Sequence, residues 1–377
     1  MEFPRKYWRN LDWPLIAAVL ILTVLGLIVI YSASSSRLAA AGDDPLHFVK
    51  RQLLFFIVGL IGLGLTISFD YRILGRWVRF LYTANIGLLT AVLFFGRTVF
   101  GSQRWFRIGP FNLQPSELAK IVLIVVLAKY LEGQEDLQGT RLLVPIFLVA
   151  LPMVLIIMQP DMGTSIIFVG ILFSLLYLAG ARTKHLAIMA GTGIAGIAGA
   201  FFVSLQGWLP IMKPYQVTRL LVFLDPYADR TRSGWNIIQS MTAIGSGGFL
   251  GKGILSGTQS QLNFLPANHT DFVFSVVAEE LGFVGGLSVL VLFAVIIWRG
   301  LFIAAYAKDT FGRLIASGCV GLFFFHVLVN VGMSLGVMPV TGLPLPFISY
   351  GGSTLLASLL AVGLLLNVGL RRKKIMF

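Results

Sequence analysis

A carboxylate at the start of an apolar helix is the first candidate for chemistry in this chain. Asp271 lies where the longest polar loop meets a strongly apolar run that begins at Phe272. At a membrane–water boundary, such a carboxylate can take a proton from the polar head of a lipid-linked molecule. The alternative is structural, since Asp is also favoured as a helix N-cap or in the first helical turn. The local sequence alone favours the cap.

Glu117 and Lys120 form a second candidate pair. They are three residues apart and therefore share a helix face. They lie at the margin of a predicted membrane span, where ionisable groups are costly and usually pair. The sequence therefore predicts a salt bridge, with or without a functional role. Arg104 and Arg107 in the preceding loop are suited either to phosphate binding or to anchoring at the interface, and the sequence slightly favours the anchor.

Two further loops hold residues of special types. Asp161 lies in the tight turn 159–164, where it can cap the next helix, yet it is predicted on the same side of the membrane as Asp271. The loop 336–353, which contains Ser349, has no charged residue and several prolines that prevent a regular helix. Irregular backbone at membrane depth persists only where protein buries it or where it lines a cavity.

Other motifs favour structural roles. His326 and Asn330 are four residues apart in a predicted span, and an interhelical hydrogen bond is expected of each. The glycines of segment 245–253 match no Walker or dinucleotide template, so we expect a loop folded on the membrane surface. The pattern contains no metal-ligand cluster and no nucleophile elbow. The single cysteine, Cys319, lies in an apolar run and is expected to be a small packing residue.

The composition indicates which elements must position these residues. The chain has 377 residues, 57% of them hydrophobic and 12% charged, and its mean hydropathy is +0.87. Repeated long apolar runs of this kind predict an all-α, polytopic membrane protein and exclude a soluble domain. The net charge of +13 is better explained by membrane orientation and contact with anionic lipids than by nucleic-acid binding.

The apolar runs predict about ten transmembrane helices in a single integral-membrane domain, 1–377. A large extracellular loop, 206–270, separates spans seven and eight. Within it, the spacing of Val217, Leu220, Leu221 and Leu224 predicts a short interfacial helix, and Trp235 to Ile244 a second one. The predicted spans are Trp13–Tyr31, Leu53–Ser68, Phe80–Phe95, Ser116–Leu131, Leu142–Met158, Met162–Gly180, Leu186–Leu205, Phe272–Trp298, Leu314–Met338 and Thr354–Leu370.

The distribution of basic residues predicts the orientation. Lys and Arg are concentrated at both ends of the chain and in short loops on one side, which predicts cytoplasmic N- and C-termini. With an even number of spans between the termini, Asp271, Asp161 and the loop 101–114 then face outside.

The loops taken together resemble the SEDS family of shape, elongation, division and sporulation proteins, the polytopic cell-wall glycosyltransferases of bacteria. Four segments carry the resemblance, in order and at predicted outside positions: 114–120, 159–164, 269–282 and 346–353. Segments 261–266 and 338–342 are more similar to the elongation members than to the division members. Ala267 departs from the Glu that is common in the family at that position.

The resemblance implies polymerisation of lipid II into β-1,4-linked glycan strands at the outer face of the bacterial cytoplasmic membrane. It assigns the essential carboxylate to Asp271, which we expect to act as general base in an inverting reaction. It also implies substrate-binding roles for residues in or near these motifs. They are Glu117, Lys120, Asp161, Arg104, Arg219, His269 and Ser349.

The leaving polyprenyl diphosphate needs positive charge. The candidate cations are Lys120, then Arg104, then Arg219, and a divalent ion, Mg²⁺ or Mn²⁺, is the alternative. The expected partners are a class B penicillin-binding protein with transpeptidase activity and other proteins of the elongation complex, with no nucleic acid. Two other functions stay open on the sequence: a lipid II flippase, because a polar cavity with intramembrane charges also suits a transporter, and a non-catalytic scaffold of the cell-wall synthesis complex.

Overall fold

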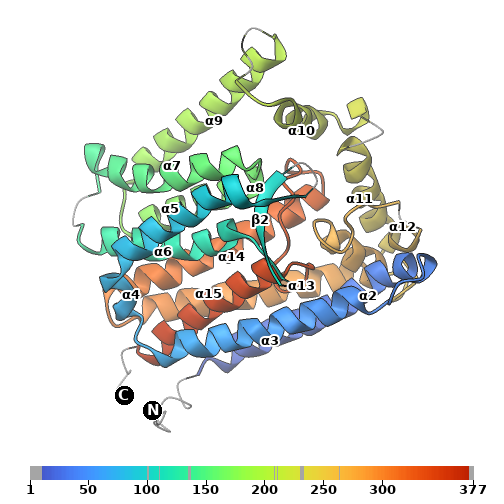
Figure 1. The fold of residues 1–377 in the computed structure, drawn as a ribbon, viewed down its shortest axis with the longest axis horizontal. Coiled ribbons are helices and arrows are strands. Elements are labelled where there is room, and N and C mark those ends of the chain that lie inside the picture. Colours follow the sequence, from blue (N-terminus) through green and yellow to red (C-terminus); the bar gives the residue numbers. More distant parts are fainter. Residues whose placement is uncertain are drawn as a thin grey trace.

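The fold is a bundle of long helices with a small sheet at one end (Figure 1). The computed structural model describes residues 11–99, 102–109, 111–134, 137–207, 209, 211–229, 233–262 and 264–372. The long helices are α2 (Trp13–Ala40), α3 (His47–Ser68), α5 (Val78–Phe95), α6 (Pro115–Glu132), α7 (Leu143–Met158), α8 (Met162–Leu178), α9 (Thr183–Leu205), α13 (Val273–Ala305), α14 (Thr310–Ser334) and α15 (Gly352–Leu370). The shorter helices are α4 (Arg72–Arg76), α10 (Pro214–Leu224), α11 (Ser233–Gly247), α12 (Thr258–Gln261) and the 3-10 turns Gly139–Leu142 and Pro226–Asp229.

The predicted all-α membrane architecture is confirmed. In the described residues, 8 helical segments are long and apolar enough to cross a membrane. The two other predicted spans are also helices, but α8 has only 17 residues and α6 carries charged residues within its 18. The basic stretches at residues 1–10 and 373–377, on which the predicted orientation partly rests, lie outside the described residues.

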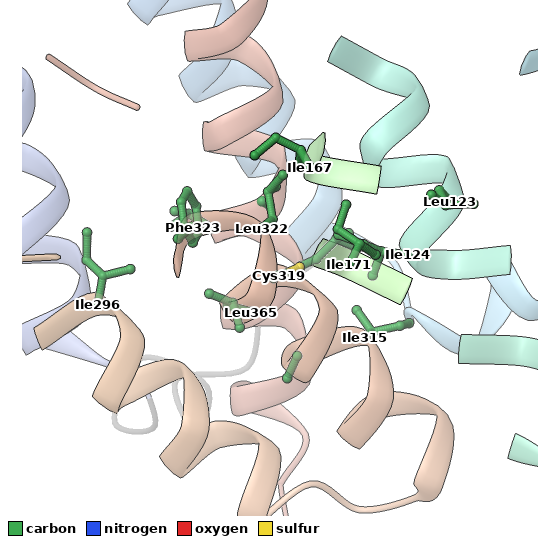
Figure 2. Packing of buried hydrophobic residues seen from close by; sticks show 14 of the residues in the cluster. Leu123, Ile124, Ile167, Ile171, Ile296, Ile315, Cys319, Leu322, Phe323 and Leu365 are labelled. Carbon is green, nitrogen blue, oxygen red and sulfur yellow. The ribbon is translucent and has the colours of Figure 1, made fainter. Parts of the chain in front are cut away.

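Helices α14 and α15 form the centre of the bundle. In the most apolar 18 residues of each helix, 78% of the residues of α14 and 89% of those of α15 are buried. Cys319 of α14 packs among Ile124, Ile171 and Leu322, as Figure 2 shows, which confirms its expected role as a small packing residue. Close packing here depends on small residues, because a Cβ atom at Gly318 would lie 2.6 Å from the side chain of Ile124.

A three-stranded antiparallel sheet precedes α6, where the sequence predicted only a loop. Its strands are β1 (Arg97–Val99), β2 (Ser102–Ile108) and β3 (Phe111–Leu113), in the order β1-β2-β3. The strands are too short to give a clear alternating pattern. The sheet matters for the site because Arg104 lies on β2, whose geometry then fixes the direction of the side chain.

The large loop between α9 and α13 lies at the end of the molecule opposite both termini (Figure 1). Both helices expected in it are present, as α10 and α11. The glycine segment 245–253, which was expected to be a loop folded on the membrane surface, packs against an interruption of α13. Gly282 has φ +67°, so the regular helix breaks there.

Four backbone hydrogen bonds join the glycine segment to that interruption. They run from Lys252 N to Glu279 O, Gly253 N to Glu280 O, Phe283 N to Gly248 O and Val284 N to Phe249 O. The segment thus satisfies the carbonyl and amide groups that the break leaves without helical partners. The first part of α13, directly after Asp271, is in this way fastened to the large loop.

Candidate active site

A cavity of about 430 Å³ lies at the end of the bundle where β2, the turn before α8 and the segment before α13 meet, and polar and charged residues line much of it. Five of the predicted site residues line it: Arg104, Glu117, Asp161, Arg219 and Asp271. They come from β2, α6, the turn before α8, α10 and the segment before α13. The fold therefore brings together groups that are up to 167 residues apart in the sequence, and the uncharged loop 336–353 supplies another part of the wall.

Asp271 does not cap a helix. The N-cap position of α13 is Phe272, and no side chain caps the helix there. The Asp271 backbone is fixed on both sides, because its N–H donates to Ala267 O over 3.1 Å and its carbonyl accepts from Asn330 Nδ2 over 2.9 Å. Asp271 is thus not the helix N-cap that the sequence offered as the structural alternative.

The Asp271 carboxylate faces the cavity without an ion-pair partner. No Lys, Arg or His nitrogen of the described residues lies within 4.0 Å of it, and its hydrogen-bond partner is Thr270. Burial raises the pKa of Asp271, while Arg104 and Arg219 act in the opposite direction from a longer distance. A carboxylate with a raised pKa and a free lone pair is suited to accept a proton.

Asp161 has the opposite environment. It is 4% exposed and caps α8, accepting from Thr164 N over 3.2 Å. Its Oδ2 also accepts from Thr164 Oγ1, Ser116 Oγ and Gln114 Nε2 at 3.0, 3.2 and 2.9 Å, and Arg104 lies 3.4 Å from its Oδ1. All its lone pairs are engaged, so Asp161 holds the N-termini of α6 and α8 together and positions Arg104.

The predicted salt bridge between Glu117 and Lys120 is present. Lys120 Nζ lies 2.7 Å from Glu117 Oε1, and both side chains are almost fully buried. Lys120 also contacts His326 Nε2 at 3.0 Å, and His326 Nδ1 lies 3.2 Å from Pro344 O. Glu117 reaches the cavity wall, whereas Lys120 lies beneath it. The interhelical bond expected of His326 is found with Lys120 of α6, whereas Asn330 donates to the backbone carbonyls of Asp271 and Leu343, which lie outside the helices.

Three arginines supply positive charge at the cavity. Arg104 stacks on Trp105 at 4.8 Å, and its buried Nε has no partner among the described residues. Arg219 Nη1 donates to Thr341 O over 3.4 Å. Arg51, in the first turns of α3, also lines the cavity and was missed by sequence reasoning. Its position just outside a predicted span was the only available signal.

His269 and Ser349 are not among the residues that line the cavity. His269 packs between Phe48 and Tyr350, with ring centroids 4.8 and 5.9 Å away. Burial lowers the pKa of His269 to about 4, so its ring is neutral at neutral pH. Ser349 Oγ donates to Thr270 O over 2.5 Å and so supports the segment that carries Asp271.

The described residues hold no group of three or more His, Cys, Asp or Glu side chains arranged to bind a metal ion. Asp271 and Asp161 line the cavity together with Glu117, and the oxygens of Asp161 are already occupied by protein donors. The positive charge that the protein itself offers to an anion comes from Arg51, Arg104 and Arg219.

A helical membrane bundle with one unpaired carboxylate opposite several arginines defines a class of protein that can act on an amphiphilic anion. Comparison with known proteins narrows this class. Residues 12–374 match the model of the FtsW, RodA and SpoVE family of cell cycle proteins. The chain belongs to this family, which confirms the resemblance to SEDS proteins.

Similar relatives align with this chain over nearly their whole length and carry enzyme names. The chain is 40% identical to the "Probable peptidoglycan glycosyltransferase FtsW" of Trichlorobacter lovleyi, covering 98% of this chain and 96% of that protein. It is 39% identical to the "Peptidoglycan glycosyltransferase MrdB" of Escherichia coli K12, with the same coverage. These near-equal identities do not separate the division branch from the elongation branch of the family.

A solved structure shares the fold. It matches with a TM-score of 0.78 at 35% identity, covering 95% of this chain and 97% of the other. That protein is part of a peptidoglycan synthase complex described as coordinating polymerisation and crosslinking.

Proposed function

We propose that this chain is a peptidoglycan glycosyltransferase that polymerises lipid II into β-1,4-linked glycan strands, with Asp271 as the general base. The observation that carries the proposal is the contrast between the cavity's carboxylates. Asp161 is saturated by protein donors and Glu117 is paired with Lys120, whereas Asp271 has no cation within 4.0 Å among the described residues. Of these three carboxylates, only Asp271 is neither paired with a cation nor held by several protein donors.

In the proposed reaction, the 4-hydroxyl of an acceptor GlcNAc attacks C1 of a donor MurNAc from the side opposite the leaving group. The new bond joins the acceptor oxygen to C1, and the bond from C1 to the polyprenyl diphosphate breaks. Asp271 takes the hydroxyl proton as the attack proceeds. The diphosphate leaves with the bonding electron pair, and its negative charge needs cations close by.

We assign the diphosphate contacts to Arg104 and Arg219 before Lys120. Both guanidinium groups line the cavity, and guanidinium suits two-pronged binding of phosphate oxygens. Lys120 is 1% exposed and already bonded to Glu117 and His326, which favours a supporting role for it. His269 and Ser349 act through the positions of neighbouring segments, and a bound divalent ion would add charge at the same diphosphate.

The proposal extends to orientation, partner and process. The cavity would open to the outside of the bacterial cytoplasmic membrane, and a class B penicillin-binding protein would crosslink the product. Membership of a synthase complex in a protein with the same fold supports such a partner. Segments 261–266 and 338–342 favour an elongation role of the RodA type.

The test is polymerisation in detergent, where no bilayer exists to transport lipid across. Purified chain, lipid II and a class B penicillin-binding protein are incubated together, and the products are separated by length on a gel. Glycan strands are expected with the wild-type chain and not with Asp271→Asn. No strands with the wild-type chain would favour the transport alternative. Strands that form equally well with the partner alone would favour the scaffold, whereas strands made at the wild-type rate by Asp271→Asn would exclude Asp271 as the base.

A further inference from the structure

A second cavity lies at the opposite end of the molecule and is apolar. It has a volume of about 390 Å³ and is lined by residues of α2, α3 and α15 alone, with one residue, Leu11, just before α2. In Figure 1, α2 and α3 lie along one edge of the bundle and α15 lies next to them on the inner side, with the start of α2 and the end of α15 at the same end. The lining is apolar and α3 also exposes Ile61 and Leu65, so we expect this surface to face the hydrocarbon of the membrane.

The length of this groove matches one leaflet of a bilayer. Along α15 it extends from Leu370 to Leu359, which corresponds to about 16 Å at the ~1.5 Å rise of a helical residue. Half of a hydrocarbon core of ~30 Å is about 15 Å. Trp13, which is 59% exposed, lies at the outer end of the groove, where an interfacial tryptophan belongs. The groove therefore begins at headgroup level and ends near the bilayer centre.

Positive charge gathers at the headgroup end. Arg299 is paired with Asp12, the residue between groove residues Leu11 and Trp13, at 2.6 Å. Arg372 is the second residue beyond the end of α15 and stacks over the same Phe302 ring as Arg299, at 5.7 and 4.7 Å respectively.

Arg372 lacks a compensating charge. Its Nη1 is buried without a hydrogen-bond partner in the described residues, and no carboxylate among them lies within 4.0 Å. The neighbouring Arg371 is bonded to Asn367 and lies 3.8 Å from Asp70. One guanidinium two residues beyond the groove residue Leu370 thus has no carboxylate to balance its charge.

We propose that this groove binds one anionic phospholipid of the leaflet on the side of the termini, with an acyl chain in the groove and the phosphate at Arg372. The charge of Arg372 complements a lipid phosphate, and the length of the groove matches an acyl chain in one leaflet. A transmembrane helix as the occupant would need neither an anion site nor a groove of one-leaflet length. The site is remote from Asp271, so it does not depend on the proposed glycosyltransferase activity.

The test counts lipids bound to the intact, delipidated chain by native mass spectrometry, with phosphatidylglycerol and phosphatidylcholine as probes. We expect phosphatidylglycerol to bind about fivefold more tightly, the factor that corresponds to ~1 kcal/mol per basic residue near an anionic lipid. Arg372→Gln should remove this preference and keep the weaker binding. Arg79→Gln, at an exposed arginine away from the groove, is the matched control and should leave the preference unchanged.

A groove-filling variant tests the acyl-chain half of the proposal. Gly64 lines the groove, and a Cβ placed on it meets no atom within 4 Å, so Gly64→Leu should fold normally and occupy the space. It should abolish high-affinity binding of both lipids. Gly87→Leu is the matched control, since Gly87 on α5 has equally open space but lies outside the groove.

Three results would overturn the proposal. They are equal binding of the two lipids by the wild-type chain, unchanged phosphatidylglycerol binding in Gly64→Leu, or a change in oligomeric state in that variant without loss of lipid. The last result would identify a second copy of the chain as the occupant. Thermal unfolding of each variant in the same detergent separates loss of the site from loss of the fold.

Discussion

Replacing Asp271 and Asp161 by asparagine in turn should separate activity from stability. The two carboxylates line the same cavity, and the substitution changes only one oxygen to NH₂ in each case. Their environments differ, because Asp161 accepts from several protein donors and Asp271 faces the cavity without a cation. The two variants are therefore matched controls for each other.

Asp161→Asn should mainly destabilise the protein. If the NH₂ group takes the place of Oδ2, the donors of Gln114, Ser116 and Thr164 face another donor. If the NH₂ group takes the place of Oδ1 instead, the backbone N–H of Thr164 and the guanidinium of Arg104 face a donor. At least two donors lose their acceptor in either orientation. At ~1–3 kcal/mol for each unsatisfied buried group, the loss should be about 2 kcal/mol or more.

Asp271→Asn should mainly abolish activity. An amide cannot accept the proton, and loss of a general base typically costs about 10²–10⁴-fold in rate, or ~3–5 kcal/mol of barrier. Stability should not fall, because burial raises the folded-state pKa of Asp271, which means that the fold disfavours the charged form relative to the unfolded chain. A group of this kind stabilises the fold only below its unfolded pKa, and that contribution disappears as the pH rises through the folded pKa.

The assays are glycan synthesis from lipid II in detergent and thermal unfolding of the same samples. The expected pattern is an inactive, stable Asp271→Asn variant and an unstable Asp161→Asn variant that keeps more of its initial rate at low temperature. Near wild-type synthesis by Asp271→Asn would refute the reasoning and direct the search for the base to Asp161 or Glu117. A lower unfolding temperature for Asp271→Asn than for Asp161→Asn would refute the assignment of structural roles.

Three further predictions test other parts of the structure. Because the pKa of Asp271 is raised and the base must be ionised, the rate of synthesis should fall on acidification with a midpoint above 3.8; a rate that is flat down to pH 4 would contradict this. Breaking the buried pair of Glu117 and Lys120 by one Ala substitution should lower the free energy of unfolding by ~3 kcal/mol. Each single variant should lose more than half as much activity or stability as the double variant. Additive losses in a double-mutant cycle would show that the two residues act separately. A cysteine at the exposed Ser256 should react with an impermeant thiol reagent from outside intact cells, whereas labelling only after lysis would reverse the proposed orientation; the native Cys319 is buried and should stay silent.

Residue type and spacing predicted the local features of the site. The three-residue spacing of Glu117 and Lys120 predicted their salt bridge, and the apolar runs predicted each long helix. The loop 336–353 was correctly expected to be protected, since it lines the cavity. Interactions within one helix or one turn can be inferred in this way because the backbone fixes the distances.

Contacts between segments that are distant in the sequence could not be predicted from it. Arg51 meets the wall that contains Asp271 only after α3 and the segment before α13 are packed together, and nothing near Arg51 signals this. Lys120 was ranked first among the cations for the diphosphate, but bonds to Glu117 and to the remote His326 bury it. The sheet was missed because its strands are too short for periodicity to separate them from a loop.

The hydrogen-bonded contact between the glycine segment and the break in α13 makes these two stretches of sequence depend on each other. A Cβ atom at Gly282 would lie 2.3 Å from Gly251 N, and one at Gly251 would lie 2.2 Å from Glu280 O. Neither stretch can accept a larger residue unless the other moves. A chimera that exchanges only the large loop between family members would therefore pair a foreign loop with a native break in α13. The resulting loss of stability should be restored when residues 278–284 are exchanged as well. Substitutions in the two stretches should accordingly show strong epistasis, although more than 20 residues separate Gly251 from Gly282.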